Sequence, residues 1–439
     1  MEDRWLSWEE VSSRREITRE EACFAFTRAA GQVKKNLTAY GDGFPYACSE
    51  GGRYEQVENK GWTTGFWTGQ LWLLYLQEED GKEKEEMKEQ ALLQVSSFLQ
   101  RIQEKRDVDH HDMGFLYSPS CVMAYRLAGS HAGREAALLA AEQLCSRFQE
   151  KGAFLQAWGE MGARDNYRFI IDCLLNLPLL YWASRESGKE RYSRQADEHL
   201  STAMRYVIRE DGSTWHTVFM NPETGGFDHG ATCQGYTDGS AWARGQAWGV
   251  YGTALAYERT RKEEYKRAFE EVARYFLLHL PTDLCPFWDL SFGIWEEGKV
   301  EETEGEEGKE EVREEAKEEG KVESREARRK AGETEPRDSS SAAIAACGML
   351  CMANCLAGEE KALWEGMARR LLKALADGYL IQKGEEVKRG GILKHATYSK
   401  KSPFNTCTPE GVDEFVLWGD YFFLEGLLRV MDPTFVPCW

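Results

Sequence analysis

Residues 238–258 read DGSAWARGQAWGVYGTALAYE, and they show the pattern on which the fold prediction depends. A loop that carries Gly, Asp or Ser leads directly into an apolar, aromatic-rich run that is too long for a strand. Five further segments share this pattern, and they span residues 61–75, 114–127, 165–184, 338–353 and 411–430. Because their apolar residues cover nearly the whole circumference, each segment predicts a helix that is buried on all sides.

Segments with one polar face alternate with these six. They lie at residues 19–40, 84–105, 133–150, 191–208, 262–280 and 361–380. Each has apolar residues at positions i, i+3, i+4 and i+7 and charges opposite, which is the pattern of an amphipathic surface helix. Residues 215–232 are the exception, because they favour a short strand pair over a turn.

The alternation predicts an all-α fold, the (α/α)6 barrel, as a single domain over residues 1–439. Closing six helical hairpins into a ring buries every inner helix and leaves each outer helix with one solvent-exposed face. The inner helices would then all begin at one mouth of the ring. A two-domain helical solenoid is the alternative, but solenoid repeats usually resemble one another more closely in sequence.

Residues 296–337 are compositionally different from the rest of the chain. They hold 17 Glu and 10 Lys or Arg and have no aromatic residue. Such a segment cannot bury enough apolar surface to offset chain entropy, so we predict a mobile surface insertion within the barrel domain. A docking segment for a basic partner is the alternative.

Charge and cysteine usage limit the partners and the compartment. A net charge of −19 argues against binding to nucleic acid or to an anionic membrane surface. The opening residues MEDRWLSWEE show no secretory signal, and no run of about 18 apolar residues predicts a membrane span. The 12 cysteines show no C-x-x-C spacing, so we expect reduced thiols and a cytoplasmic location. No pattern predicts an oligomeric state.

Asp112 lies in the densest polar cluster, DVDHHDMG, directly before the second apolar segment. It could be an active-site carboxylate or simply the N-cap of the helix. Adjacent His110 and His111 also suggest a metal site, but neighbouring histidines seldom converge on one ion. We therefore predict no metal and no other cofactor, a catalytic role for Asp112, and substrate binding by His111.

Asp172 stands alone among apolar residues in RFIIDCLLNLPLL. Burial there should raise its pKa, as a general acid that works near neutral pH requires. The alternative is a hydrogen-bonded core aspartate that braces the preceding loop. Two carboxyls at adjacent helix entrances, one protonated and one ionised, would divide acid and base roles as in glycosidases.

Residues 215–249 add polar donors and flat rings that suit a sugar. Sugar rings have apolar C–H faces and polar edges, so indoles beside His, Gln and Arg favour carbohydrate. Arg244 could hold a substrate carboxylate through two hydrogen bonds, or it could pair with Asp238. The predicted binding residues are His216, Gln234, Arg244 and Trp248, together with Trp62 and Trp158 across the mouth.

Taken together, these motifs resemble the unsaturated glucuronyl hydrolases. The matching stretches, in chain order, are GWTTGFWTGQLWLLY, DHHDMGFLYS, QAWG, RFIIDCLLNLPLL, STWHT, TDGSAWARGQAWGVYG, DSSSAAIAACG and FVLWGDYFFLEGLLR. The resemblance implies an (α/α)6 barrel and a substrate made by a polysaccharide lyase, with a C4=C5 double bond in its terminal uronic acid. It implies that Asp172 protonates C4 and helps water add at C5, while Asp112 holds ring hydroxyls and tunes Asp172.

The loop HATYSKKSPFNTCTPEG resembles a region that meets the second sugar in members acting on sulfated glycosaminoglycans. The resemblance therefore implies that Ser399, Lys400, Lys401 and Ser402 could bind sulfate, and it leaves open whether sulfated or unsulfated chains are preferred. The leading hypothesis is the release of unsaturated glucuronic acid from glycosaminoglycan oligosaccharides. An unsaturated rhamnogalacturonyl hydrolase, a helical-toroid sugar epimerase and a non-catalytic saccharide-binding protein are the alternatives.

Overall fold

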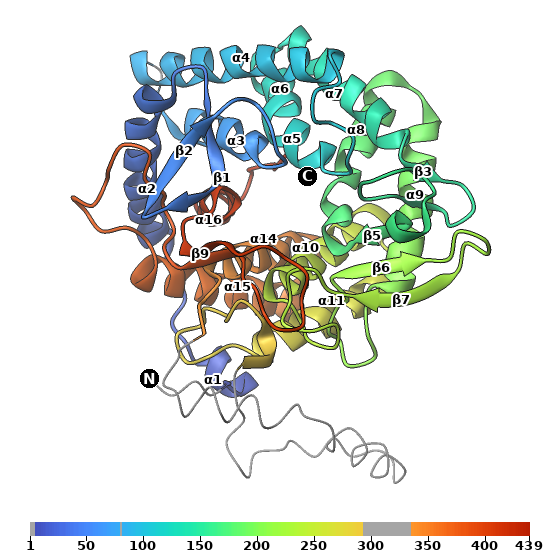
Figure 1. Ribbon diagram of the computed structural model, residues 1–439. Coiled ribbons are helices and arrows are strands. Elements are labelled where there is room, and N and C mark those ends of the chain that lie inside the picture. The colour runs from blue at the N-terminus through green and yellow to red at the C-terminus, as the bar shows by residue number, and fades with distance from the viewer. Residues whose placement is uncertain (1–4, 80, 293–334) are drawn as a thin grey trace.

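Two concentric rings of helices make up the protein (Figure 1). The computed structural model describes residues 5–79, 81–292 and 335–439. The inner helices are α3 (Thr64–Gln77), α5 with η1 and α6 (Met113–Ala128), α8 (Leu177–Ser187), α10 (Ala243–Thr260), α14 (Ser339–Cys355) and α16 (Leu417–Met431). The ring closes where α16 packs against α3, so the all-α (α/α)6 barrel is confirmed and the open solenoid is wrong.

The outer ring carries the amphipathic segments. Its helices are α2 (Arg19–Tyr40), α4 (Lys82–Gln103), α7 (His131–Cys145), α9 (Glu190–Tyr206), α11 (Glu263–Leu278) and α15 (Gly358–Gly378), with the short α1 (Trp8–Ser12) before them. The N-terminus of α2 has a capping box, in which Thr18 and Glu21 each accept the other's backbone N–H. Among all the helices of the described residues, none is long and apolar enough to cross a membrane.

Two inner segments depart from a single continuous α-helix. The second contains the π-helical turn η1 (Ser118–Val122), with Pro119 at its start. The third forms strand β5 (Arg168–Ile170) and the 3₁₀ turn η3 (Ile171–Leu175) before α8 begins. Pro178 lies in the first turn of α8, where its missing N–H costs nothing, whereas the middle of a longer helix would not accommodate it.

Short antiparallel strands project from the mouth of the ring. Strands β1 (Phe44–Glu50) and β2 (Arg53–Val57) form one pair, and β8 (Ala396–Ser399) and β9 (Glu410–Glu414) form another. The small pair β3 (Phe148–Gln149) and β4 (Phe154–Leu155) joins α7 to β5. The strand pair predicted at residues 215–232 is confirmed as β6 (Thr217–Met220) and β7 (Phe227–Ala231), with β5 added along β6.

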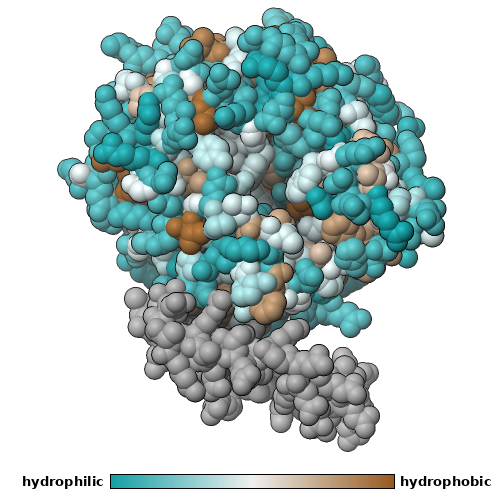
Figure 2. Space-filling model, in the orientation of Figure 1, coloured by the Kyte–Doolittle hydropathy of each residue, from teal (hydrophilic) through white to brown (hydrophobic). Residues whose placement is uncertain are grey.

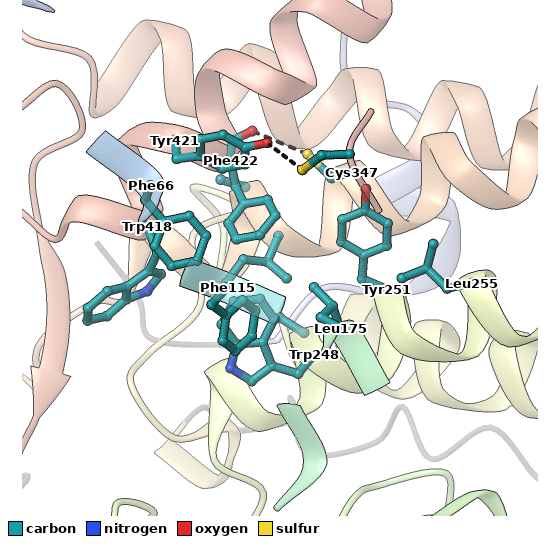
Figure 3. Close-up of a cluster of buried hydrophobic side chains, with 14 of the residues drawn as sticks. Phe66, Phe115, Leu175, Trp248, Tyr251, Leu255, Cys347, Trp418, Tyr421 and Phe422 are labelled. Atoms are coloured by element: carbon teal, nitrogen blue, oxygen red, sulfur yellow. Dashed lines mark hydrogen bonds between the residues drawn. The ribbon is translucent and has the colours of Figure 1, made fainter. Parts of the chain in front are cut away.

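An aromatic layer fills the middle of the barrel (Figure 3). Phe115 lies 5.2 Å from Trp248 and 5.5 Å from Phe66 between ring centroids. Phe422 and the C-terminal Trp439 stack at 5.7 Å and continue the layer. Contacts between such rings stabilise the fold by about 0.5–1.5 kcal/mol per pair beyond their burial. The layer gives the mouth a rigid apolar floor.

The predicted charged insertion lies outside the described residues, except for its last three positions. There, a carboxylate oxygen of Glu335 accepts the Trp288 indole N–H at 2.8 Å. Arg337 lies 3.3 Å from a carboxylate oxygen of Asp283 and stacks on the Phe287 ring. Residues 335–337 are thus part of the barrel, and a mobile insertion over residues 296–334 stays a prediction.

Candidate active site

A cavity of about 300 Å³ opens at the mouth of the ring, on the face that is hollowed near its centre in Figure 2. Nine of the eleven predicted site residues line it, and they come from the entrances of four inner helices and from the loops between them. They are Trp62, His111, Asp112, Trp158, Asp172, His216, Gln234, Arg244 and Trp248. The convergence follows from the fold, because every inner helix begins at this end.

Asp112 occupies the N-cap position of α5, but within the described chain its side chain makes no capping hydrogen bond. Its carboxylate instead lies 3.0 Å from Nδ1 of His110 and 3.4 Å from Nε2 of His111. Burial disfavours the charged form, but the interactions with His111 and His110 outweigh burial and lower the pKa of Asp112 below its usual value. Asp112 is therefore ionised at neutral pH.

Asp172 lies on the turn η3. Its Oδ1 is buried and has no hydrogen-bond partner among the described residues, so Asp172 does not brace a loop through that atom. Burial raises the pKa of Asp172 well above its ordinary value, and the charge on Asp112 raises it further. The pKa values of the two carboxyls are thus shifted in opposite directions, which favours a protonated Asp172 beside a charged Asp112.

Two buried arginines hold the loop that precedes α5. Arg101 donates to the carbonyl of Asp107 at 2.5 Å. Arg147 donates to the carbonyl of Asp109 at 3.2 Å and to that of Gly159, in the neighbouring loop, at 3.0 Å. Both arginines are essentially inaccessible to solvent. Since backbone carbonyls inside a protein need donors, these bonds fix the loop path that places Asp112 beside the cavity.

His216 is held in one tautomer by the backbone. Its Nδ1 accepts the N–H of Cys233 at 3.0 Å. Burial lowers the pKa of His216 to about 3, so the ring is neutral and carries its proton on Nε2. His216 therefore offers the site a neutral N–H donor and no positive charge.

Arg244 is fully buried, and its partner is Asp338, not Asp238, which the sequence offered as an alternative. Its Nη1 lies 3.5 Å from the Asp338 carboxylate and donates to the Thr397 carbonyl at 2.7 Å. Its Nη2 donates to the Tyr398 carbonyl at 2.6 Å. The pairing with Asp238 is wrong because the carboxylate of Asp238 accepts the backbone N–H of Thr232 instead.

Indole rings form the walls of the cavity. Trp62 donates from Nε1 to the Tyr398 hydroxyl at 3.0 Å. Trp158 is 38% exposed, so its ring face is open to a ligand, while Trp248 forms part of the buried floor. The side-chain N–H of Gln234 donates to the Tyr398 carbonyl at 2.9 Å, and this bond does not use the amide oxygen. Flat apolar faces next to polar groups are what a sugar ring requires.

Ser399 and Ser402 are not among the described residues that line the cavity. Both serines are buried. The Ser402 hydroxyl donates to the Tyr236 carbonyl at 2.6 Å and accepts backbone N–H groups from Phe404 and Asn405. This hydroxyl has the bonding pattern of a turn residue, so the structure gives no support to sulfate binding by Ser402.

Sequence reasoning missed Tyr398 and Asp338. Tyr398 lines the cavity between Trp62 and Arg244, and burial raises the pKa of its hydroxyl to about 12. Asp338 accepts the hydroxyls of Ser340 and Ser341 and is completely buried. The signal for Asp338 was present, since it opens an apolar segment as Asp112 does. Tyr398 lies on β8, inside the stretch HATYSKKSPFNTCTPEG that was expected to meet the second sugar, but the sequence did not single it out.

Comparisons with known proteins identify the family of this chain. A family model described as Glycosyl Hydrolase Family 88 matches residues 42–310. An unsaturated chondroitin disaccharide hydrolase from Streptococcus pyogenes serotype M1 is 39% identical over 418 residues, which cover 94% of this chain and 92% of that protein. The crystal structure of an unsaturated glucuronyl hydrolase from Streptococcus agalactiae matches with a TM-score of 0.84 at 35% identity, covering 98% and 96% of the two chains.

A second solved structure contains a ligand. It is an aspartate-to-asparagine mutant of an unsaturated glucuronyl hydrolase from Streptococcus agalactiae, complexed with dGlcA-GalNAc6S. It matches with a TM-score of 0.77 at 32% identity and covers 98% of this chain and 96% of that one. The resemblance seen in the sequence motifs is confirmed. The chain belongs to Glycosyl Hydrolase Family 88 and is a glycoside hydrolase of the unsaturated glucuronyl hydrolase type.

Proposed function

We propose that this enzyme hydrates the C4=C5 double bond of a 4,5-unsaturated glucuronic acid at the non-reducing end of lyase-generated glycosaminoglycan oligosaccharides. One observation carries the proposal, namely that two carboxyls share a cavity while their pKa values are displaced in opposite directions. Such a pair supplies a proton at neutral pH and keeps a negative charge beside it. Relatives at 37–39% identity are named unsaturated chondroitin disaccharide hydrolases, which supports a chondroitin-type disaccharide as substrate.

In this mechanism Asp172 gives its proton to C4, and the double bond electrons move to form the new C–H bond. Water then adds at the electron-poor C5 and returns a proton to the Asp172 carboxylate, which restores the acid. The hemiketal at C5 collapses, the sugar ring opens, and the remaining saccharide leaves. Asp112 binds ring hydroxyls and, by its charge, keeps Asp172 protonated.

The other cavity residues bind and orient the sugar in this proposal. Arg244 places positive charge near the carboxylate that is conjugated to the double bond. The Nε2–H of His216 and the amide of Gln234 offer hydrogen bonds to hydroxyls. Trp158 presents an exposed ring to the apolar face of the sugar, because it is the most accessible indole of the cavity.

A sugar epimerase would need a pair of histidine bases at the mouth. His111 and His216 both line the cavity, but burial lowers their pKa values to about 4 and about 3. Imidazoles that are so difficult to protonate are weak bases, so they favour the hydrolase over the epimerase.

The test is a panel of defined unsaturated disaccharides from chondroitin and from rhamnogalacturonan, followed by the loss of ultraviolet absorbance of the double bond. We expect turnover of the chondroitin disaccharide by the wild type and none by Asp172→Asn, which should still bind it in calorimetry. Asp165→Asn, an exposed position in the same segment, is the matched control and should keep wild-type rates. Faster turnover of the rhamnogalacturonan disaccharide, or wild-type rates in Asp172→Asn, would contradict the proposal.

A cytoplasmic location is part of the same proposal. All twelve cysteines are free thiols. Thiols survive in this form in a reducing compartment. Fractionating cells of the source organism and assaying the hydrolase in each fraction would test the location.

A further inference from the structure

The His111 ring is buried but forms no hydrogen bond. It is 1% exposed, and neither of its nitrogens has a hydrogen-bond partner in the part of the chain that the structure describes. Oδ1 of Asp172 is a second buried atom without a partner, and it faces the same space. Buried polar atoms that have lost water and make no hydrogen bond cost free energy, so their meeting in one place indicates a ligand.

The three side chains of His111, Asp112 and Asp172 are spaced as metal ligands are. Nε2 of His111 lies 3.4 Å from Oδ1 of Asp112 and 3.6 Å from Oδ1 of Asp172. One such atom from each residue lies within 4.8 Å of the other two. Ligands bonded at 2.0–2.2 Å to a tetrahedral zinc ion are about 3.3 Å apart, so two of the three separations already fit.

We propose that His111, Asp112 and Asp172 form a binding site for one divalent transition-metal ion, zinc above all, and that the bound ion inhibits the enzyme. One imidazole and two carboxylates suit zinc, and a water molecule can take the fourth position. The ion bonds the carboxylate of Asp172, which is the group that donates the proton in the proposed mechanism. The proton must leave for the ion to bind, so the ion removes the acid and occupies the place of the substrate.

This site differs from the histidine pair that the sequence suggested. His110 turns toward the carbonyl of Asp107, 3.1 Å from its Nε2, and does not join the three ligands. Elsewhere in the described chain, His229 with Asp228 and His395 with Asp413 each pair at 2.7 Å on the surface. Each of those pairs has only one carboxylate and is exposed to water. They therefore serve as controls for zinc binding by a surface histidine.

The binding experiment uses the full chain, treated with EDTA and desalted. Zinc chloride is titrated by calorimetry and cobalt chloride by visible absorption. We expect one ion per chain, with affinity at least about 10-fold weaker in His111→Gln and in Asp172→Asn. The surface controls His229→Gln and His395→Gln should bind as the wild type does. Circular dichroism confirms folding, and Asp172→Asn decides the matter if His111→Gln does not fold.

Three results would overturn the site: no binding by the wild type, full binding by Asp172→Asn, or a thiolate–cobalt charge-transfer band that places the ion on cysteine. The inhibition rests on the proposed function, whereas the binding does not. Zinc should inhibit turnover competitively, EDTA should restore the rate, and EDTA alone should change nothing. If no unsaturated disaccharide is a substrate, the proposed function fails while the binding data still test the metal site.

Discussion

Four inner helices of the described barrel have an aspartate near their start, and these four aspartates form two contrasting pairs. Asp112 and Asp338 are N-caps, Asp172 lies on the turn η3 before α8, and Asp420 lies in the first turn of α16. Asp338 and Asp420, at the entrances of α14 and α16, have their carboxylate oxygens taken up by neighbouring donors. Asp112 and Asp172, at the entrances of α5 and α8, face a cavity. The same fold position therefore carries either a structural or a chemical aspartate, depending on which neighbours supply donors.

The contrast is sharpest between Asp172 and Asp420. Asp420 accepts the backbone N–H groups of Ile392 and Leu393 and the hydroxyl of Tyr54, each at 2.9 Å. Burial raises the pKa of both carboxyls, that of Asp420 to about 7. Only Asp172 has an oxygen that no described residue satisfies. Burial alone thus does not distinguish Asp172, the proposed acid, from Asp420, whereas the missing hydrogen-bond partner does.

The largest expected effect is that of Asp172→Asn. We expect kcat to fall by at least about 10²–10⁴-fold, because general acid catalysis is lost. Thermal unfolding should change little, since an amide replaces a carboxyl that is already neutral. The matched variant Asp420→Asn should keep kcat within a few-fold in the ultraviolet assay. Equal losses in both variants would erase the distinction between the two pairs.

Asp338→Asn tests the structural pair. The substitution leaves the buried charge of Arg244 without its counter-ion, and breaking a buried ion pair in this way costs about 3 kcal/mol. The free energy of unfolding from urea titration measures the loss. We expect a smaller loss of stability for Asp172→Asn. Asp338→Asn should therefore be the less stable variant, and Asp172→Asn the less active one. Unchanged stability in Asp338→Asn would mean that the carbonyls of Thr397 and Tyr398 are enough to stabilise the buried Arg244 guanidinium without a counter-ion.

Asp112→Asn should lower kcat/KM by about 10²-fold and change its pH dependence. The charge on Asp112 raises the pKa of Asp172, so removing this charge lowers that pKa. Activity requires protonated Asp172 and is lost as the pH rises through its pKa. The alkaline limb of the plot of kcat/KM against pH should therefore move to lower pH in Asp112→Asn. The same plot for Asp165→Asn should match that of the wild type. An alkaline limb that moves to higher pH would contradict the prediction that the charge on Asp112 raises the pKa of Asp172.

Local sequence patterns predicted most of the fold, because helix periodicity and helix ends are encoded over one or two turns. All twelve ring helices lie where the apolar and amphipathic segments predicted them. The third inner segment was predicted too long, since Pro178 starts α8 and the residues before it form a strand and a 3₁₀ turn. A local pattern shows that a run is buried but does not show where its backbone changes geometry.

The site was predicted where residues lie at inner-helix entrances, because the ring topology alone brings those entrances together. Contacts between distant loops could not be predicted in this way. Arg244 finds Asp338 and the carbonyl of Tyr398, which lie 94 and 154 positions away in the chain. Ser402 was expected at the sugar, but its hydroxyl bonds the Tyr236 carbonyl. The orientation of the loop that carries Ser402 depends on contacts with residues far away in the sequence, such as Tyr236.

The last comparison concerns the pH dependence of stability, and it compares wild type with Asp420→Asn. The folded protein holds a proton on Asp420 up to about pH 7, whereas the unfolded chain releases it near the ordinary value of 3.8. The stability from this group is therefore full below about pH 4 and is lost as the pH rises through about 7. The stability difference between the two proteins should fall with pH by at most about 1.4 kcal/mol per unit.

Urea titrations between pH 4 and pH 8 measure this difference directly. A difference that is flat, or that grows with pH, would mean that the three donors around Asp420 hold it ionised in spite of burial. In that case satisfied and unsatisfied aspartates differ in charge as well as in bonding. The protonated state of Asp172 would then follow from its missing partners and from the neighbouring charge of Asp112, and not from depth in the barrel alone.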